Sequence, residues 1–214
     1  TSTGFTCTPT PASGASVTCT RTTPYASGAQ STTINITDLA GNLGSSVVNF
    51  TISDTTPPGT PASAPDLQTA SDTGTSSTDN VTNDTTPSFD VVCTEAGSTI
   101  TLYDASLVVR GTVSCTGAGT TTLTASPALT SATYLMTYTE TDAAGNASGQ
   151  SPSLSVTVDA TAPTVSITSV GGDSSAPYTT ADTTPDIVVV TTVGDTVTST
   201  GFTCTPTPAS GASV

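Results

Sequence analysis

Apolar residues alternate with polar ones along short runs of this chain, and no run has the spacing of an amphipathic helix of useful length. Alternation with a period of two buries one face of a strand and leaves the other face in water. In the middle of the chain the pattern predicts seven strands, at 63–70, 88–93, 99–104, 107–115, 120–125, 134–141 and 153–158. Seven short strands separated by turn residues predict an all-β fold built as a β-sandwich.

The stretch TSTGFTCTPTPASGASV occurs twice, as Thr1–Val17 and again as Thr198–Val214. An identity of this length indicates a tandem repeat with a period of 197 residues. A duplication introduced by cloning is the alternative explanation. A fixed period of this kind is typical of an extended stack of similar modules.

A second, weaker repeat lies inside this period. The matched segments are Thr37–Asn42 with Thr141–Asn146, and Asn83–Pro87 with Ala181–Pro185. An alternating strand follows each segment, so each period holds two related modules. This predicts one complete module at 58–162, the C-terminal part of a module at 1–57 and the N-terminal part of the next module at 163–214.

Small polar residues dominate the composition, and the charge is strongly unbalanced. Sixteen acidic residues stand against Arg21 and Arg110, which gives a net charge of −14. This charge argues against nucleic acid and anionic membranes as partners. No stretch is apolar enough for membrane insertion. The absence of lysine excludes Lys–Asn isopeptide cross-links, so any covalent cross-link must come from cysteine.

The repeat explains the odd number of cysteines, which is five. Cys7 and Cys19 flank a turn-rich segment symmetrically, as in a hairpin closed by a cross-strand disulfide, and Cys93 and Cys115 form a natural second pair. Cys204 is the second copy of Cys7, and its expected partner would lie beyond the C-terminus. Four buried free thiols per period are the alternative, whereas a zinc site is disfavoured because histidine is absent. Disulfides predict an extracellular protein.

Four stretches of the central module carry a family resemblance. They are Ser71–Phe89, Glu95–Asp104, Thr141–Ser148 and Val156–Pro163. The chain resembles the bacterial immunoglobulin-like tandem repeats of giant surface adhesins and extracellular repeat filaments. The resemblance implies immunoglobulin-like β-sandwich modules in a head-to-tail array. The cysteines and the 197-residue period depart from the usual pattern of that family, and ligand specificity is not implied.

The resemblance also implies Ca²⁺ at the module junctions, since carboxylate, amide and carbonyl oxygens are the ligands that Ca²⁺ prefers. In a head-to-tail stack the first long loop of the complete module should lie beside the end of its last strand. The candidate calcium ligands at this end of the module are Asp79, Asn80, Asp84 and Asp159. The candidate calcium ligands in the loop that precedes the last strand of each module are Asp38, Asn42, Asp142 and Asn146. At the other junction Asp54 and Asp182 should face Asp142 and Asn146. The alternative is that these residues only form turns.

Two functions other than a structural role are open to this sequence. A hydrolase would need paired carboxylates, and a glycan-binding module would need exposed aromatic rings on which sugars stack. The candidate pairs are Glu95 with Asp104 and Glu140 with Asp142, and the candidate rings are Tyr25, Tyr103 and Tyr178. Without histidine, lysine or a nucleophile motif, we expect no enzymatic activity, and glycan binding is the alternative.

The sequence therefore predicts a structural segment of an extracellular, cell-surface repeat protein. It would serve as an adhesin stalk or as the body of a surface filament. Its expected partners are neighbouring modules of the same chain and, in a filament, identical chains at its sides.

Overall fold

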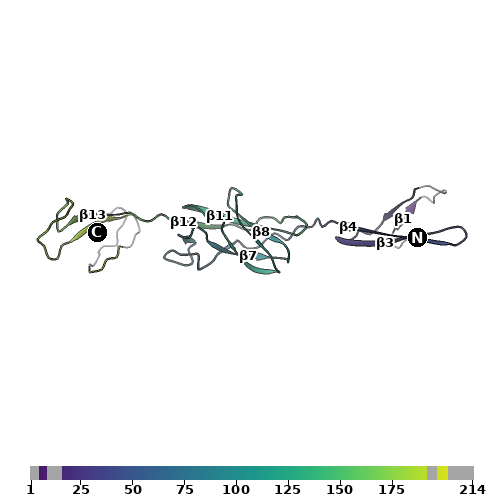
Figure 1. The fold of residues 1–214 in the computed structure, drawn as a ribbon, viewed down its shortest axis with the longest axis horizontal. Helices are drawn as coiled ribbons and strands as arrows, with labels where there is room; N and C mark the ends of the chain where they lie inside the picture. The colour runs from purple at the N-terminus through teal and green to yellow at the C-terminus, as the bar shows by residue number, and fades with distance from the viewer. Residues whose placement is uncertain (1–4, 9–15, 192–196, 202–214) are drawn as a thin grey trace. The chain divides into compact units, whose positions relative to one another are not determined.

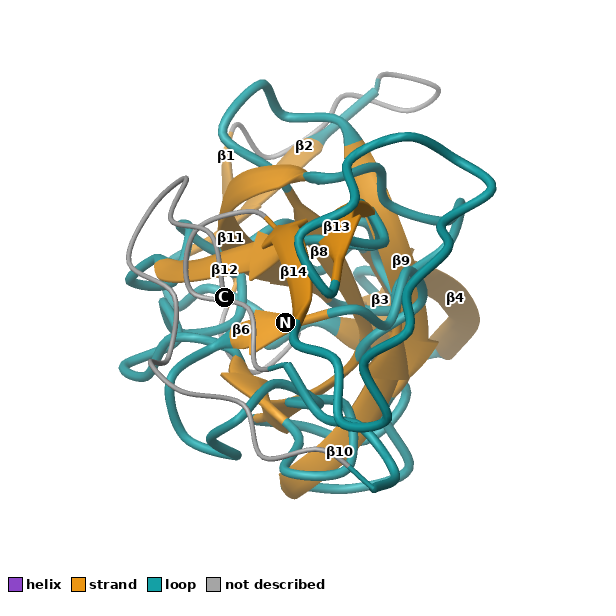
Figure 2. Cartoon of the chain, turned by 90° about the vertical axis from the view of Figure 1, so that its left-hand side faces the viewer, coloured by secondary structure: helices purple, strands orange, loops and turns teal. Residues whose placement is uncertain are grey.

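The computed structural model describes residues 5–8, 16–191 and 197–201. All regular structure in this part of the chain is β-strand, and Figure 2 shows strands and loops without a helix. The chain divides into two compact units, Thr1–Val158 and Asp159–Val214. This division does not test the module boundaries predicted above, which stay predictions.

The central module contains two sheets, whose strands gather around the labels β7, β8, β11 and β12 in Figure 1. The three-stranded sheet has the order β10-β7-β5, and the five-stranded sheet has the order β6-β12-β11-β8-β9. The strands are β5 (Asp66–Leu67), β6 (Val81–Thr82), β7 (Ser88–Cys93), β8 (Thr99–Tyr103), β9 (Val109–Ser114), β10 (Gly119–Thr124), β11 (Ala132–Thr141) and β12 (Leu154–Val158). All pairings are antiparallel except that of β6 with β12, which is parallel.

All seven predicted strands are present in this module. Six of them lie within two residues of the predicted bounds, whereas the first is shortened to Asp66–Leu67. The sequence pattern missed β6, because Val81–Thr82 lies in a polar stretch and becomes a strand only by pairing with β12.

The core of the module lies between the two sheets. Phe89 and Val91 from the three-stranded sheet meet Met136, Tyr138 and Val156 from the five-stranded sheet, and each of these side chains is at most 1% exposed. Burying apolar surface contributes about 25 cal/mol per Å². A core made of so few large side chains explains why the module also uses a disulfide and buried polar networks, which are described below.

The N-terminal strands form two hairpins. β1 (Phe5–Thr8) pairs with β2 (Thr18–Arg21), and β3 (Gly28–Thr37) forms a long ladder with β4 (Leu43–Ile52), seen in Figure 1. The β3–β4 hairpin has the same register as β11–β12. The pair Gly28↔Ile52 corresponds to Ala132↔Val158, Gln30↔Phe50 to Tyr134↔Val156, and Thr32↔Val48 to Met136↔Leu154.

In the second unit, β13 (Val165–Val170) pairs with β14 (Ile187–Thr191) in antiparallel fashion, with an irregularity between Ile167 and Ser169. The strand β14 follows Asp182-Thr-Thr-Pro185 just as β7 follows Asp84-Thr-Thr-Pro87. In sequence, β14 is therefore the counterpart of β7.

Candidate functional site

The two Asp-x-Ala-Gly-Asn loops have the same geometry. Asp38 Oδ1 accepts hydrogen bonds from the amides of Ala40 (2.9 Å) and Asn42 (2.8 Å), and its Oδ2 accepts one from Asn42 Nδ2 (2.7 Å). Asp142 makes the same three hydrogen bonds with Ala144 (2.9 Å) and Asn146 (2.8 Å for the amide and for Nδ2). In each loop the hydrogen bonds, first that from the Asn side chain, lower the pKa of the Asp. These Asp and Asn residues are therefore turn formers in this structure.

A second set of matched turns precedes β7 and β14. The amide of Thr86 donates to Asp84 Oδ1 at 2.8 Å, and the amide of Thr184 donates to Asp182 Oδ1 at 2.9 Å. Asp54 and Asp159 cap the two chain segments that follow β4 and β12, where each accepts a hydrogen bond from the amide two residues later at 3.0 Å. The internal repeat of the sequence is thus repeated in the local hydrogen bonding.

The loop around β6 joins several predicted calcium ligands. Ser71 Oγ donates to Asp84 Oδ2 (3.1 Å), and the amide of Asn80 donates to Asp72 Oδ2 (3.2 Å). Asp72 is 4% exposed, and its Oδ1 is buried without a hydrogen-bond partner among the described residues. Asp72 is not among the ligands predicted from the sequence, because nothing local distinguishes it from the neighbouring loop residues.

The structure brings parts of the predicted junctions together. The amide of Thr157 donates to Asn80 O (2.9 Å), so the loop around β6 lies beside the end of β12, two residues before Asp159. At the other end of the module, Asn146 Nδ2 donates to the Asp54 carbonyl at 3.2 Å. In the described part of the chain, no group of three Asp, Glu, Cys or His side chains is arranged to hold a metal ion. Calcium binding therefore stays a prediction.

Glu140 is fully buried beneath the turn that joins β7 to β8. Its carboxylate accepts hydrogen bonds from the Thr94 amide (3.0 Å to each oxygen), Thr94 Oγ1 (2.7 Å), the Glu95 amide (3.3 Å) and Ser98 Oγ. Burial raises the pKa of Glu140, but the hydrogen bonds from Ser98, Thr94 and Glu95 outweigh it, and the net pKa is lowered. Its counterpart in the β3–β4 hairpin is Ile36.

Asp104 is another buried carboxylate of the module, besides Asp72 and Glu140. It accepts hydrogen bonds from Arg110 Nε (3.0 Å) and Nη2 (2.7 Å) and from the amides of Ser106 and Val108. Burial raises its pKa, whereas the hydrogen bond with Arg110 and those from the two amides lower it, and the net pKa is lowered. The Arg110 guanidinium also lies 5.4 Å from the Tyr134 ring centroid. Asp104, Glu140 and Asp142 thus have structural roles that account for them without catalysis.

Cys93 and Cys115 are joined by a disulfide with a Cα–Cα distance of 5.8 Å, and both are nearly fully buried. The β1–β2 register places Cys7 directly opposite Cys19. The side chain of Cys7 lies outside the described residues, so the Cys7–Cys19 disulfide stays a prediction. Cys204 also lies outside them.

The three tyrosines considered for glycan binding are half-buried. Tyr25 packs edge-on against Phe50, with ring centroids 5.0 Å apart, and the Arg21 guanidinium lies 3.5 Å above its ring. Tyr178 Oη donates to the Ile167 carbonyl at 2.7 Å, and Tyr103 is part of the β8 ladder. None of the three is a freely exposed ring on which a sugar could stack.

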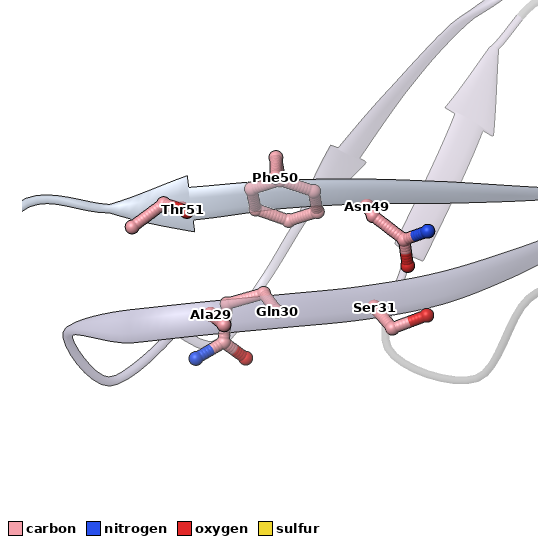
Figure 3. Close-up of a pocket in the computed structure, with 6 residues that line it drawn as sticks. All are labelled: Ala29, Gln30, Ser31, Asn49, Phe50 and Thr51. Atoms are coloured by element: carbon pink, nitrogen blue, oxygen red, sulfur yellow. The ribbon is translucent and has the colours of Figure 1, made fainter.

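A shallow hollow lies along the β3–β4 hairpin. It is lined by three consecutive cross-strand pairs, Ala29 with Thr51, Gln30 with Phe50 and Ser31 with Asn49, and Figure 3 shows these six side chains on the two strands. No group in it is suited to catalysis. The hollow marks a stretch of hairpin that the described residues leave uncovered.

The two-sheet arrangement is that of an immunoglobulin-like β-sandwich. Residues 59–160 match the family described as "Bacterial Ig-like domain". The predicted fold class and family resemblance are thereby confirmed for the central module.

The chain is also similar to a solved structure titled "Biofilm associated protein - BSP domain". The two are 20% identical with a TM-score of 0.32, and the match covers 68% of this chain and 21% of that chain. The chain thus spans about a fifth of that protein's length. No curated protein matches this chain. In the part that the structure describes, no helix could cross a membrane.

Proposed function

We propose that this chain is a non-enzymatic structural segment of an extracellular repeat protein, serving as an adhesin stalk or as the body of a surface filament. The observation that carries the proposal is the combination of a bacterial Ig-like domain at 59–160 with the identity of Thr1–Val17 and Thr198–Val214. A module repeated at a fixed period builds length, because each copy contacts its neighbours along the chain.

The way in which the chain enters and leaves the central module supports this role. The Asp54 carbonyl is hydrogen-bonded to Asn146, in the loop at one end of the β11–β12 ladder. The last strand ends at Val158, which pairs with Ala132 at the opposite end of the ladder. A ten-residue strand spans roughly 30 Å. The chain therefore enters and leaves the module at opposite ends of the β11–β12 ladder, and each module would add the full length of that ladder to the array.

Cross-links would stiffen each module. The Cys93–Cys115 disulfide joins the last residue of β7 to the residue that follows β9, and we propose a second one between Cys7 and Cys19. Cys204, as the copy of Cys7, would pair in the same way with a cysteine beyond the C-terminus. Such disulfides persist outside the cytoplasm, which fits a cell-surface location.

Calcium at the module junctions is part of the same proposal. Asp72, with its buried and unpartnered carboxylate oxygen, supports a cation beside the loop that carries Asp79, Asn80 and Asp84. A bound cation would satisfy that oxygen and offset the repulsion between the loop carboxylates. Removing calcium would then lower the melting temperature of the central module.

Electron microscopy of intact cells, labelled with gold-tagged antibodies against the central module, tests the proposal. Thin threads of fixed length rooted on the cells would identify a stalk, and ordered bundles would identify a filament. Imaging with and without a chelator tests the calcium component. Label confined to the cell interior would overturn the proposed function.

A further inference from the structure

Among the described residues, the outer face of the five-stranded sheet in the central module carries no charged side chain. Ile100 on β8 and Met136 and Tyr138 on β11 point into the core, so the residues between them point outward. Most of the outward residues are threonines, including Thr99, Thr101, Thr112, Thr137, Thr139 and Thr141. The ladder places Thr101 directly between Thr112 and Thr139. This face is therefore a regular array of hydroxyl and methyl groups.

Apolar side chains lie among these threonines. The register places Leu135, Val81 and Val109 on the same face, where they are 48%, 40% and 45% exposed. The hydroxyl groups can bond to one another, as Thr133 Oγ1 and Thr157 Oγ1 do at 3.0 Å. Covering this face would bury methyl groups and apolar side chains while hydroxyl groups keep partners, so the cost of removing water from it is small.

The five strands contain two charged residues, and both are directed away from this face. Glu140 is 0% exposed and is held beneath the β7–β8 turn. Arg110 lies at the irregularity in the β8–β9 register, and its side chain is 18% exposed. It is paired with Asp104 and lies near the ring of Tyr134, which packs against the core.

The acidic residues of the module lie on other surfaces. On the outer face of the three-stranded sheet, Asp66 lies directly opposite Asp90. Asp79 precedes β6 by two residues and Asp142 follows β11, so both lie in loops at the rim of the five-stranded sheet. The two outer faces of the sandwich therefore differ in charge.

The β3–β4 hairpin shows the same absence of charge. Neither strand contains an Asp, Glu, Lys or Arg residue. By the register shared with β11–β12, Thr33 corresponds to Thr137, and Val47, directly opposite Thr33, is 59% exposed. A chain of net charge −14 thus keeps the equivalent face free of charge in both modules.

The charge of the chain indicates which partner fits this face. Copies of net charge −14 repel each other, so two of them can approach closely only where neither carries charge. We propose that the outer faces of the five-stranded sheets of two copies pack against each other, face to face. The contact uses the same surface on both copies and is isologous. This inference rests on the proposed function, and it names the lateral contact that a filament would use.

The size of the face sets the strength of the contact. Five strands about 4.8 Å apart, each of roughly six residues, make a face of about 400 Å². A stable interface buries about 800 Å² on each partner, so a single pair of modules should bind weakly, with a Kd on the order of 0.1–1 mM. In an array of modules the same contact is repeated along the chain, and many weak contacts add up to stable lateral association.

Sedimentation equilibrium on the full 214-residue protein, up to about 1 mM and with free thiols alkylated, tests this inference. We expect a dimer whose population increases with concentration and with added salt, because salt screens the repulsion between copies. Thr137→Asp places a charge near the middle of the face and should weaken dimerisation by about tenfold or more. Thr120→Asp is the matched control, because Thr120 is exposed on the outer face of the three-stranded sheet.

Mixing Thr137→Asp with Thr137→Lys provides the decisive measurement. Each variant alone should stay monomeric because like charges meet in the contact, whereas the mixture should dimerise because opposite charges meet there. Melting curves of both variants and of Thr120→Asp check that all three are folded.

A wild-type protein that is monomeric at every concentration would overturn the inference and leave this face to a partner other than this chain. A dimer that Thr137→Asp weakens no more than Thr120→Asp does would place the contact elsewhere and would also overturn it. Both results would leave the stalk form of the proposed function intact. Label confined to the cell interior, in the microscopy experiment, would overturn the function itself.

Discussion

The carboxylate of Glu140, on β11, accepts hydrogen bonds from both the amide and the hydroxyl of Thr94, 46 residues earlier in the chain. Thr94 directly follows Cys93, so this contact and the Cys93–Cys115 disulfide fix the same end of the module. A hydrogen-bonded carboxylate at the edge of the core thus holds the β7–β8 turn against the five-stranded sheet.

Replacing Glu140 should therefore destabilise the central module. Glu140→Ala leaves the Thr94 and Glu95 amides and the Thr94 hydroxyl without the acceptor that they have in the wild type, and we expect a loss of about 3 kcal/mol in the free energy of unfolding. Urea unfolding followed by circular dichroism measures this loss. Glu95→Gln is the control, since the exposed Glu95 side chain neighbours the same turn and should have little effect. Equal stability of the two variants would contradict this role of Glu140.

The lowered pKa values of Glu140 and Asp104 predict how stability depends on pH. A carboxyl group whose pKa is lower in the folded state contributes stability that is complete above its unfolded pKa and is lost as the pH falls through the folded pKa. Unfolded carboxyl groups titrate at about pH 4. The melting temperature should therefore be nearly constant at neutral pH and decrease below about pH 4.

Glu140→Gln distinguishes the contribution of this residue from that of the other carboxyl groups. Its amide cannot titrate in the acid range, so the variant should be less stable at neutral pH and lose less stability on acidification. Melting curves recorded in steps from neutral to acidic pH provide the comparison. A variant whose acid dependence matches that of the wild type would show that Glu140 is not a source of it.

The Cys93–Cys115 disulfide should stabilise the module by about 3 kcal/mol, the value that the chain-entropy model gives for a loop of this size. Its sequence separation is 22 residues. The double variant Cys93→Ala/Cys115→Ala should therefore melt at a markedly lower temperature. Reduction followed by alkylation tests the Cys7–Cys19 disulfide in the same double variant. If these two cysteines are linked, alkylation after reduction should add more mass to the protein than alkylation without reduction. An unchanged melting temperature in the double variant would contradict the stabilising role.

Local features of this structure could be read from the sequence, whereas long-range ones could not. The alternation of apolar residues located β7, β8, β10, β11 and β12 because a strand with one buried face carries that pattern itself. The Asp142-Ala-Ala-Gly-Asn loop was recognisable for the same reason, since Asp142 and Asn146 form the turn together.

The strand β6 and the environments of Glu140 and Asp72 depend on partners far away in sequence. Val81–Thr82 is a strand only because β12 lies beside it. From the sequence, Glu140 with Asp142 is a candidate carboxylate pair for a hydrolase. Its structural role is hidden there, because the hydrogen-bond donors to its carboxylate lie in the segment from Thr94 to Ser98, and nothing in that segment points to strand β11. Burial of Asp72 likewise arises from packing of the loop around β6.

Trypsin should distinguish the two arginines of the chain. Arg110 lies in β9, and its side chain is 18% exposed and held by Asp104 through Nε and Nη2, so cleavage there requires opening of the sheet. Arg21 ends the short two-stranded β1–β2 hairpin. Under native conditions we expect cleavage after Arg21 to be roughly 100-fold faster than cleavage after Arg110, as measured by intact mass spectrometry over time.

Asp104→Ala removes the contact that holds Arg110 and should increase cleavage there without changing cleavage after Arg21. Rapid cleavage after Arg110 in the wild-type protein would show that the β8–β9 ladder opens far more readily than its hydrogen bonds indicate.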